Sequence, residues 1–290
     1  MRFFLLCFLF TFFNDYLNAQ EKIEVYLIGG QSNATGQGYV SNFSEDMRVE
    51  SSVLIFHSGP PHLQCGFASL SWHPLHQASE SPDRFGLELG LGYKLHELRP
   101  KAKIAIIKHA HSGTNLYSQW DPGRSGKDFS GQGEQYQIFI KTVKIGLDSL
   151  RKKGYLPVII GMAWQQGESD ADKGGIASSR YGKNLKRFIH RVRSDLNARK
   201  MLFVYGHVYP PPNLGKGILE VRKAQRDIDQ QSGSSLATKG AFLVSTDGLS
   251  FRANDRNTKY PNDFVHFGTS GIWKLGLRMA TEMNRHFTMQ

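Results

Sequence analysis

The sequence is poor in cysteine, in charge and in long apolar runs. Its 290 residues include two cysteines, Cys7 and Cys65, and 21% of the residues are charged whereas 40% are apolar. A disordered chain would show the opposite balance, so the composition predicts a folded chain with a large apolar core. No apolar run approaches the roughly 20 residues of a membrane-spanning helix. The composition therefore excludes a transmembrane protein and a disulfide-rich scaffold.

The longest apolar run lies at the N-terminus and is typical of a secretory signal peptide. Arg2 precedes Phe3–Phe13, and a polar stretch then leads to Ala19, a small residue at which cleavage is expected. A buried N-terminal strand or helix is the alternative. We predict a signal peptide over 1–19 and a single domain over 20–290, exported to the periplasm or the cell exterior. Cys65 is then alone in the mature chain, which excludes an intramolecular disulfide.

Short apolar runs alternate with helical patterns along the rest of the chain. Consecutive apolar residues are typical of strands buried on both faces of a parallel sheet. The predicted strands are Ile23–Ile28, Val53–Phe56, Ile104–Ile107, Val158–Trp164, Met201–Val208 and Ala241–Ser245. The predicted helices cover roughly 86–98, 134–152, 181–196, 217–230 and 269–287. This alternation predicts an α/β fold, a three-layer α/β/α sandwich with a doubly wound, mainly parallel sheet.

A serine, a histidine and an aspartate stand at the ends of predicted elements, where open parallel sheets form their sites. Ser32 directly follows the first strand, although the elbow motif Gly-x-Ser-x-Gly occurs nowhere in the chain. Asp263 and His266 directly precede the last helix. A carboxylate three residues from an imidazole can orient it, and the imidazole can then take the proton of a serine hydroxyl.

Two more polar segments follow strands and supply hydrogen-bond donors. Gly113 and Thr114 follow the strand that ends near residue 108, and the segment 164–170 follows the strand that ends at Trp164. Backbone N–H groups of Ser32 and Gly113, with the side-chain amide of Gln166, can hold an oxyanion. Gln165 is an alternative to Gln166 because the two glutamines are adjacent.

These four segments together resemble a known family. Gly30-Gln31-Ser32-Asn33, Gly113-Thr114, Trp164-Gln165-Gln166-Gly167-Glu168-Ser169-Asp170 and Asp263-x-x-His266 are similar to the motifs of SGNH-type hydrolases of the sialate O-acetylesterase group. The nearest branch is carbohydrate esterase family 6, the acetylxylan esterases. The resemblance covers about 23–285 and implies an esterase that removes acetyl groups from sugars.

The resemblance also implies roles for individual residues. Ser32 would be the nucleophile, His266 the general base and Asp263 the acid that orients it. Phe264 departs from the glycine that often follows this aspartate, so Glu168 is a rival for the acid. The residues expected at the wall of the site are Gln31, Asn33, Thr114, Gln165 and Glu168.

Neither a metal nor an organic cofactor is expected, because acyl transfer by serine needs none. His62-x-x-Cys65 and His73-x-x-His76 have spacings that metals use, but we interpret this segment as a loop near the site. The expected partner is an acetylated carbohydrate: acetylated xylan, a related glycan or O-acetyl sialic acid. A non-catalytic sugar-binding protein, with Tyr117, Trp120 and Trp164 stacking on sugars, is the other class that the sequence allows.

The net charge of +11 comes from two segments. Residues 141–153 and 177–200 carry it, and both are predicted to contain helices on one face of the sheet, away from the site. Nucleic acid is therefore not an expected partner. A solvated surface explains these charges, and the sharper hypothesis is a weak electrostatic association with an anionic polymer.

Overall fold

The computed structural model describes residues 20–64, 66–124, 130–209 and 217–287. The predicted signal peptide, 1–19, lies outside the described residues, as does Cys65. A central sheet has the strand order β4-β3-β6-β1-β7-β8-β9. Its strands are β1 (Glu21–Gly30), β3 (Leu54–His57), β4 (His73–Pro74), β6 (Lys103–Lys108), β7 (Tyr155–Gln165), β8 (Leu202–Gly206) and β9 (Ala241–Val244).

The sheet is parallel except at its edge, where β4 pairs antiparallel with β3. A separate antiparallel pair consists of β2 (Gly38–Tyr39) and β5 (Arg84–Phe85). The helices are α1 (Ser32–Thr35), α2 (Leu87–Leu98), α3 (Glu134–Lys152), α4 (Glu168–Lys173), α5 (Gly175–Ser179), α6 (Tyr181–Asp195), α7 (Ile218–Ile228) and α8 (Thr269–Phe287). Two short 3₁₀ helices are η1 (Val40–Asn42) and η2 (Arg252–Asn254).

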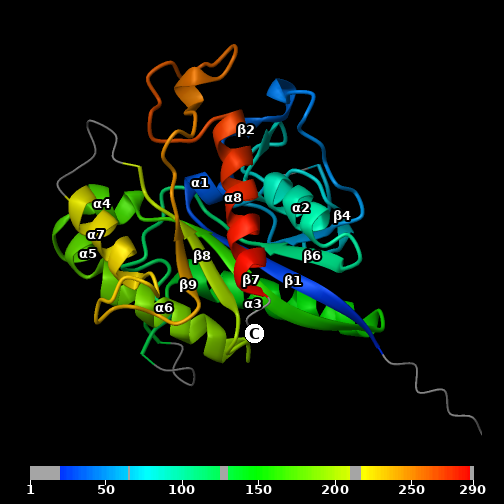
Figure 1. The fold of residues 1–290 in the computed structure, drawn as a ribbon, viewed down its shortest axis with the longest axis horizontal. Coiled ribbons are helices and arrows are strands. Elements are labelled where there is room, and N and C mark those ends of the chain that lie inside the picture. The colour runs from blue at the N-terminus through cyan, green and yellow to red at the C-terminus, as the bar shows by residue number, and fades with distance from the viewer. Residues whose placement is uncertain (1–19, 65, 125–129, 210–216, 288–290) are drawn as a thin grey trace, which may run out of the picture.

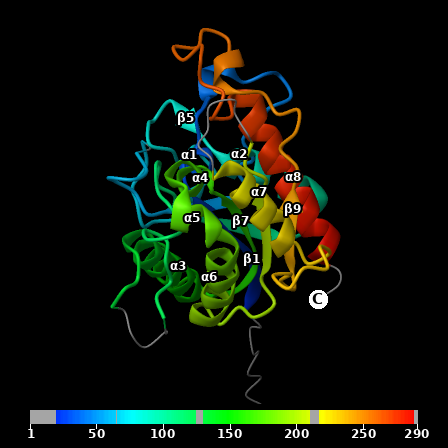
Figure 2. The same ribbon diagram turned by 90° about the vertical axis from the view of Figure 1, so that its left-hand side faces the viewer.

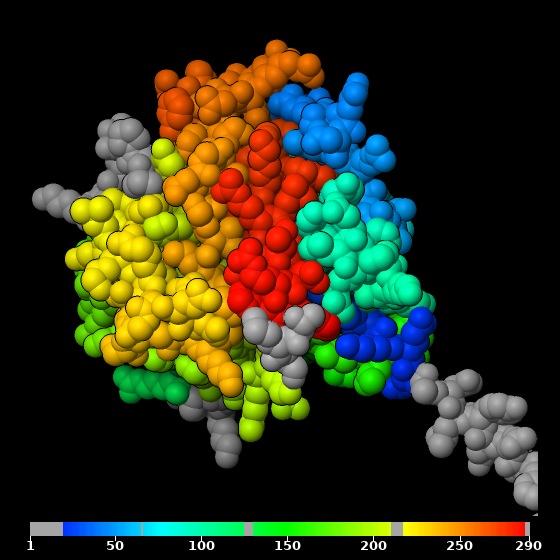
Figure 3. Space-filling model, in the orientation of Figure 1, coloured from blue at the N-terminus to red at the C-terminus, as the bar shows by residue number. Residues whose placement is uncertain are grey.

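Helices cover both faces of the sheet. In Figure 2 the sheet lies between α3 and α6 on one side and α8 on the other. Neighbouring β1 residues point to opposite cores: Val25 and Leu27 pack with α3, α6 and α7, whereas Tyr26 and Ile28 pack with α2 and α8. In Figure 3, α8 lies between the segments of α2 and β9. Burial on both faces explains why the strands are apolar at consecutive positions.

The predicted fold class is confirmed. The six predicted strands and five predicted helices are present, with ends that differ by a few residues. The helices α3 and α6, which overlap the basic segments 141–153 and 177–200, lie on one face as expected. The sequence did not indicate β4, the β2–β5 pair or the short helices α1, α4 and α5, because two to six residues are too few for a periodic pattern.

A fully buried ion pair fixes the turn that carries Ser32. Lys108 and Glu88 have no exposed side-chain surface, and Lys108 Nζ also donates to the carbonyl of Thr35, the last residue of α1. The Glu88 carboxylate accepts the N–H groups of Ala78 and Gly86. The pair therefore ties α1 to β6 and α2 through charged groups that water cannot reach.

Replacing Lys108 by methionine should be strongly destabilising. Lys108→Met leaves the Glu88 carboxylate buried without its cation, which costs about 3–5 kcal/mol of unfolding free energy. Chemical denaturation of both proteins measures the difference. Lys103→Met is the control, because Lys103 pairs with Glu21 at the surface, where an ion pair contributes about 0–1 kcal/mol. Equal effects of the two substitutions would contradict the prediction.

Candidate active site

Three neighbouring strands end together and bring the polar segments to one edge of the sheet. Gly30 of β1 is in register with Gln165 of β7, and the Gln31 N–H donates to the Gln165 carbonyl at 2.9 Å. On the other side, the His111 N–H donates to the Gly30 carbonyl at 3.1 Å. Gly30 has φ +134°, and a Cβ there would lie 2.1 Å from the Gln165 oxygen. Glycine is therefore required where the chain turns from strand into α1.

The predicted serine, histidine and aspartate form one hydrogen-bonded chain. Ser32, the first residue of α1, has its Oγ 3.0 Å from His266 Nε2. His266 Nδ1 lies 2.8 Å and 3.0 Å from the two carboxylate oxygens of Asp263. The loop that holds Asp263 and His266 precedes α8 and lies above α1 in Figure 1. The order of groups suits transfer of a proton from the serine to the imidazole.

The Asp263 carboxylate is held in its charged form by its surroundings. Burial alone would raise the pKa of Asp263, but hydrogen bonding and attraction from His266 lower it below its ordinary value. The backbone N–H groups of Val265 and His266 also donate to Asp263. Arg252 Nη1 lies 3.6 Å from the same carboxylate. Phe264, which stands where the family often has glycine, is 42% exposed and does not line the pocket.

The rival carboxylate, Glu168, has a different contact. Its Oε1 accepts a hydrogen bond from Asn33 Nδ2 at 2.8 Å. Asn33 Nδ2 also donates to the Val265 carbonyl, and Asn33 Oδ1 accepts the Phe267 N–H. Asn33 is 1% exposed, and these hydrogen bonds attach the loop that contains His266 to α1. In this geometry Asp263, and not Glu168, stands beside the imidazole.

A pocket of about 420 Å³ opens above Ser32 and His266. Its walls come from the four predicted segments and from residues that the sequence did not indicate. The lining residues are Gln31, Ser32, Gln37, Glu80, Ser112, Gly113, Glu168, Ser169, Asp172, Arg252, Val265 and His266. Gln37, Glu80, Asp172 and Arg252 lie outside the four predicted segments, and no motif marks them.

Gln31, rather than Gln166, presents its side-chain amide to this pocket. Gln31 Oε1 accepts hydrogen bonds from Gln166 Nε2 and from the N–H groups of Gly167 and Ser169. None of the described residues accepts a hydrogen bond from Gln31 Nε2. Gln166 Nε2 is instead held 2.6 Å from Asp170 Oδ2, and Gln166 is fully buried outside the pocket. The expectation of Gln166 as an oxyanion donor therefore does not fit the geometry.

Several other expected wall residues lie in the interior. Gln165 is fully buried in β7, and its side chain packs against Gly206 of β8. Thr114 donates to the His111 carbonyl and accepts from Trp120 Nε1. Trp120 and Trp164 are fully buried and pack on one another with ring centroids 5.0 Å apart. Neither tryptophan can stack on a sugar, whereas Tyr117, the third residue expected to do so, is partly exposed.

Asp170, quoted in the motif without a role, anchors a loop of the site. Its carboxylate accepts the backbone N–H groups of Leu116 and Tyr117. Burial raises the pKa of Asp170 to about 6, against the lowering effect of these hydrogen bonds and of Gln166. Asp170 thereby holds the segment after β6, which contains Gly113, against α4.

Glu80 contributes a second carboxylate to the pocket. Burial would raise its pKa, but hydrogen bonds from Ser112 and Gln37 and the charge of Arg84 lower it. Ser112 Oγ donates to Glu80 at 2.6 Å, and Gln37 Nε2 donates at 2.7 Å. With Glu168 and Asp172, three acidic residues line the pocket against the single cation of Arg252.

The described residues show neither a metal-binding cluster nor a spanning helix. Within them, no three His, Cys, Asp or Glu side chains converge as metal ligands. His73 bonds to Ser71, and His76 to the Pro74 carbonyl. No described helix combines the length and the apolar character needed to cross a membrane.

A serine, an imidazole and a carboxylate in hydrogen-bonded sequence, beside a pocket at the carboxyl edge of a parallel sheet, form the arrangement that serine hydrolases use. Residues 22–285 match the family model described as carbohydrate esterase, sialic acid-specific acetylesterase. The chain belongs to this family, and it is a carboxylic ester hydrolase of the carbohydrate O-acetylesterase class.

Solved structures with the same fold come from plants and bacteria. A protein from Arabidopsis thaliana is 22% identical with a TM-score of 0.67, covering 92% of this chain and 99% of that one. NanS is 14% identical with a TM-score of 0.67, covering 93% and 99%. A carbohydrate acetylesterase from Xanthomonas citri is 17% identical with a TM-score of 0.58, and the match covers 91% of this chain but 56% of that longer one. No curated protein matches the chain in sequence.

Substitution of the two carboxylates should separate their roles. Asp263→Asn should lower kcat by about 10³- to 10⁴-fold, because the amide no longer stabilises the imidazolium or fixes its tautomer. Glu168→Gln should lower kcat by less than about tenfold, since glutamine Oε1 can still accept from Asn33. Hydrolysis of 4-nitrophenyl acetate measures both. A loss in Glu168→Gln as large as that in Asp263→Asn would assign the orienting acid to Glu168.

Proposed function

We propose that this protein is an exported serine esterase that removes O-acetyl groups from carbohydrate through an acyl-enzyme. One observation carries the proposal: Ser32 Oγ, His266 and Asp263 are joined by hydrogen bonds of 2.8–3.0 Å beneath an open pocket. The family supports removal of O-acetyl groups from sugars. Export rests on the signal-peptide pattern of residues 1–19.

The reaction proceeds in two steps that use only these groups. His266 Nε2 takes the Ser32 proton as Oγ attacks the acetyl carbonyl carbon, and the imidazolium returns the proton to the departing sugar oxygen. Water then attacks the acetyl-serine with His266 as base, and acetate leaves. Asp263, charged throughout, stabilises the imidazolium at each step.

The oxyanion hole combines two backbone donors with one side chain. Ser32, Gly113 and Gln31 line the pocket, and the proposed donors are the backbone N–H groups of the first two and Nε2 of Gln31. Three hydrogen bonds to Gln31 Oε1 hold this amide rigid. A donor fixed before the reaction needs no reorganisation when negative charge develops on the substrate oxygen.

The charges of the pocket favour a neutral acetylated sugar. Glu80, Glu168 and Asp172 outnumber Arg252 at its walls. A carboxylate-bearing sugar would be repelled by these acids, whereas the hydroxyl groups of a neutral sugar can donate hydrogen bonds to them. Acetylated xylan or a related polysaccharide or oligosaccharide is therefore the proposed substrate.

O-acetyl sialic acid is the second candidate. The family description names sialic acid, and Arg252 supplies a buried cation, 5% exposed, at the pocket. Arg252 Nη2 donates to Tyr39 Oη and its guanidinium lies over the Tyr260 ring. The three acids that line the same pocket would repel a sialate carboxylate there. Comparing acetate release from acetylated xylan and from O-acetyl sialic acid distinguishes the two substrates.

Ser32→Ala should abolish acetate release from acetylated xylan without unfolding the protein. Ser32 Oγ has its hydrogen bond with His266, so its removal leaves the fold intact but removes the nucleophile. Circular dichroism verifies folding, and enzymatic assay of acetate measures turnover. Release from the purified variant at the wild-type rate would refute the acyl-enzyme route.

Gln31→Glu should lower kcat by about 10²- to 10³-fold, the usual loss for one oxyanion donor. Glutamate keeps an acceptor oxygen for the three N–H donors but replaces the donor NH₂ with a negative oxygen. Ser169→Asp is the charge control, since Ser169 lines the same pocket and no described hydrogen bond involves its hydroxyl. A similar loss in both variants would reduce the role of Gln31 to pocket charge alone.

A further inference from the structure

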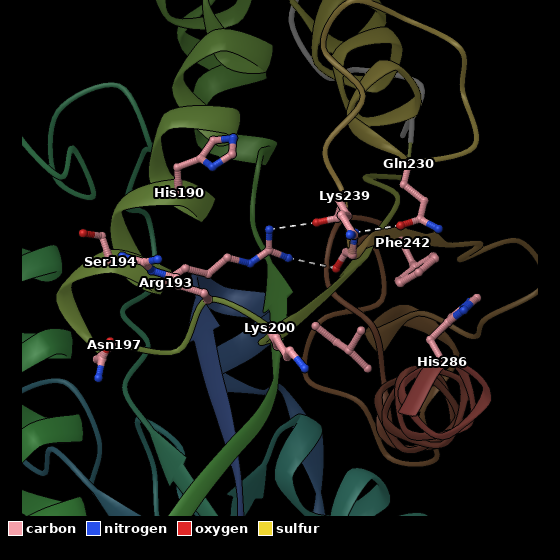
Figure 4. A pocket seen from close by; sticks show the side chains of 12 residues that line it. His190, Arg193, Ser194, Asn197, Lys200, Gln230, Lys239, Phe242 and His286 are labelled. Atoms are coloured by element: carbon pink, nitrogen blue, oxygen red, sulfur yellow. Dashed lines mark hydrogen bonds between the residues drawn. The ribbon is translucent and has the colours of Figure 1, made fainter. Parts of the chain in front are cut away.

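A hollow lined by basic residues lies at the opposite end of the sheet from Ser32. It has a volume of about 800 Å³ and lies where β8 and β9 begin, between the C-terminal half of α6 and the end of α8. Figure 4 shows residues of α6 on one side and Gln230, Phe242 and His286 on the other. Pockets of 300–1,000 Å³ are of the size that binds small molecules or a few sugar units.

This hollow, which we call the basic hollow, is lined by cations and by no acid. Arg193, Arg199, Lys200 and Lys239 line it together with two histidines, and no Asp or Glu does. One acid, Glu282, bonds directly to a lining residue, because its carboxylate contacts His286 Nε2 as well as Arg285. Glu282 itself lines a different hollow. Lining of a single sign concentrates the potential inside a concave surface and attracts anions.

Arg193 is held in a fixed position at the wall of this hollow. Its guanidinium donates to the carbonyls of Met201, Lys239 and Gly240 (Figure 4 shows the last two), and the residue is 8% exposed. Among the described residues, no carboxylate lies within ion-pair distance of it. Burial lowers the pKa of Arg193 to about 10. The cost of burying this charge is offset by backbone dipoles alone, so an anion would be stabilised beside it.

The other walls suit a sugar. Phe242 and the His286 ring stack with centroids 3.6 Å apart and provide an apolar wall together with Leu202. Ser194, Asn197 and Gln230 add hydroxyl and amide groups. Apolar surface for a ring, polar groups for hydroxyls and cations for a carboxylate are the complement of a uronic acid.

A second hollow adjoins the basic hollow, and two neighbouring basic hollows favour a chain over a small anion. The neighbouring hollow, of about 520 Å³, shares Asn197, Arg199 and Lys200 with it. Arg151 of α3, paired with Asp148, lines the neighbouring hollow, and again no acid does. The two basic segments of the sequence thus meet at one extended surface.

We propose that the basic hollow binds a carboxylate-bearing sugar unit of a polysaccharide, separately from the catalytic pocket. The choice of a glycan as the anion rests on the proposed function. The catalytic pocket, lined by acids, takes a neutral acetylated sugar, and the basic hollow takes an acidic sugar of the same kind of polymer. The enzyme is thereby held on substrates that carry both.

Trigalacturonic acid, which carries no ester, tests binding independently of the esterase activity. Calorimetry should detect its binding to the wild-type protein, and not that of neutral xylotriose at the same concentration. Arg199→Gln/Lys239→Gln should weaken binding at least tenfold. Lys141→Gln/Lys183→Gln removes the same charge from exposed positions of α3 and α6 outside the basic hollow and should weaken binding less than twofold. Hydrolysis of 4-nitrophenyl acetate should be unchanged in both variants.

Three results would overturn the proposal. If both double variants weakened trisaccharide binding equally, the net charge of the protein, and not a defined site, would account for the binding. Binding of inorganic sulfate as tight as that of the trisaccharide would identify a simple anion site. Absence of trisaccharide binding in an enzyme that still hydrolyses 4-nitrophenyl acetate would remove the site and leave the esterase function standing.

Discussion

The amide side chain of Asn33 is the contact on which the geometry of the catalytic site depends. It joins three segments that are more than 90 residues apart: α1 with Ser32, Glu168 at the start of α4, and the loop of His266 through Val265 and Phe267. An amide can both donate and accept, so one buried neutral group satisfies a carboxylate, a carbonyl and an N–H. A charged side chain in this place would pay a desolvation cost and could not serve both kinds of partner. The short distance between Ser32 and His266 follows from this fastening.

The order of the strands explains why Asn33 can join these three segments at the carboxyl edge of the sheet. β6, β1 and β7 are neighbours and parallel, so their carboxyl ends deliver Gly113, Ser32 and Glu168 to one place. The buried pair of Lys108 and Glu88 then fixes the far end of α1. Rigid supports on both sides of a four-residue helix keep Ser32, the proposed nucleophile, in place without a longer helix, which would have to be stabilised by its own packing.

The fold and the three side chains of the hydrogen-bonded chain could be located from the sequence because both leave a local pattern in it, whereas the other pocket residues leave none. Burial on both faces made the strands continuous apolar runs, and Ser32, Asp263 and His266 directly adjoin elements that are long enough to recognise. The roles of the glutamines could not be assigned, because the turn at Gly30 decides which side-chain amide reaches the pocket. The φ of +134° at Gly30 that makes this turn cannot be predicted from the sequence. Trp120 and Trp164 were expected at a sugar, but both lie under α3 and α6 because the large rings fill the core. Glu80 and Arg252 enter the pocket through tertiary contacts alone.

The two ends of the sheet have opposite electrostatic character, and this separation has a physical reason. A general base must keep an imidazole able to take a proton, and a carboxylate partner supports that only where no excess of cations competes for it. Arg252 is the one cation at the catalytic pocket, and Asp263 lies against it. The cations of the basic hollow lie at the opposite end of the sheet, where β8 and β9 begin. The five residues of β8, at about 3.3 Å each, separate them from the carboxyl edge by more than the roughly 8–10 Å over which salt screens exposed charges. A strongly basic surface can therefore exist on this enzyme without disturbing the proton transfer between Ser32 and His266.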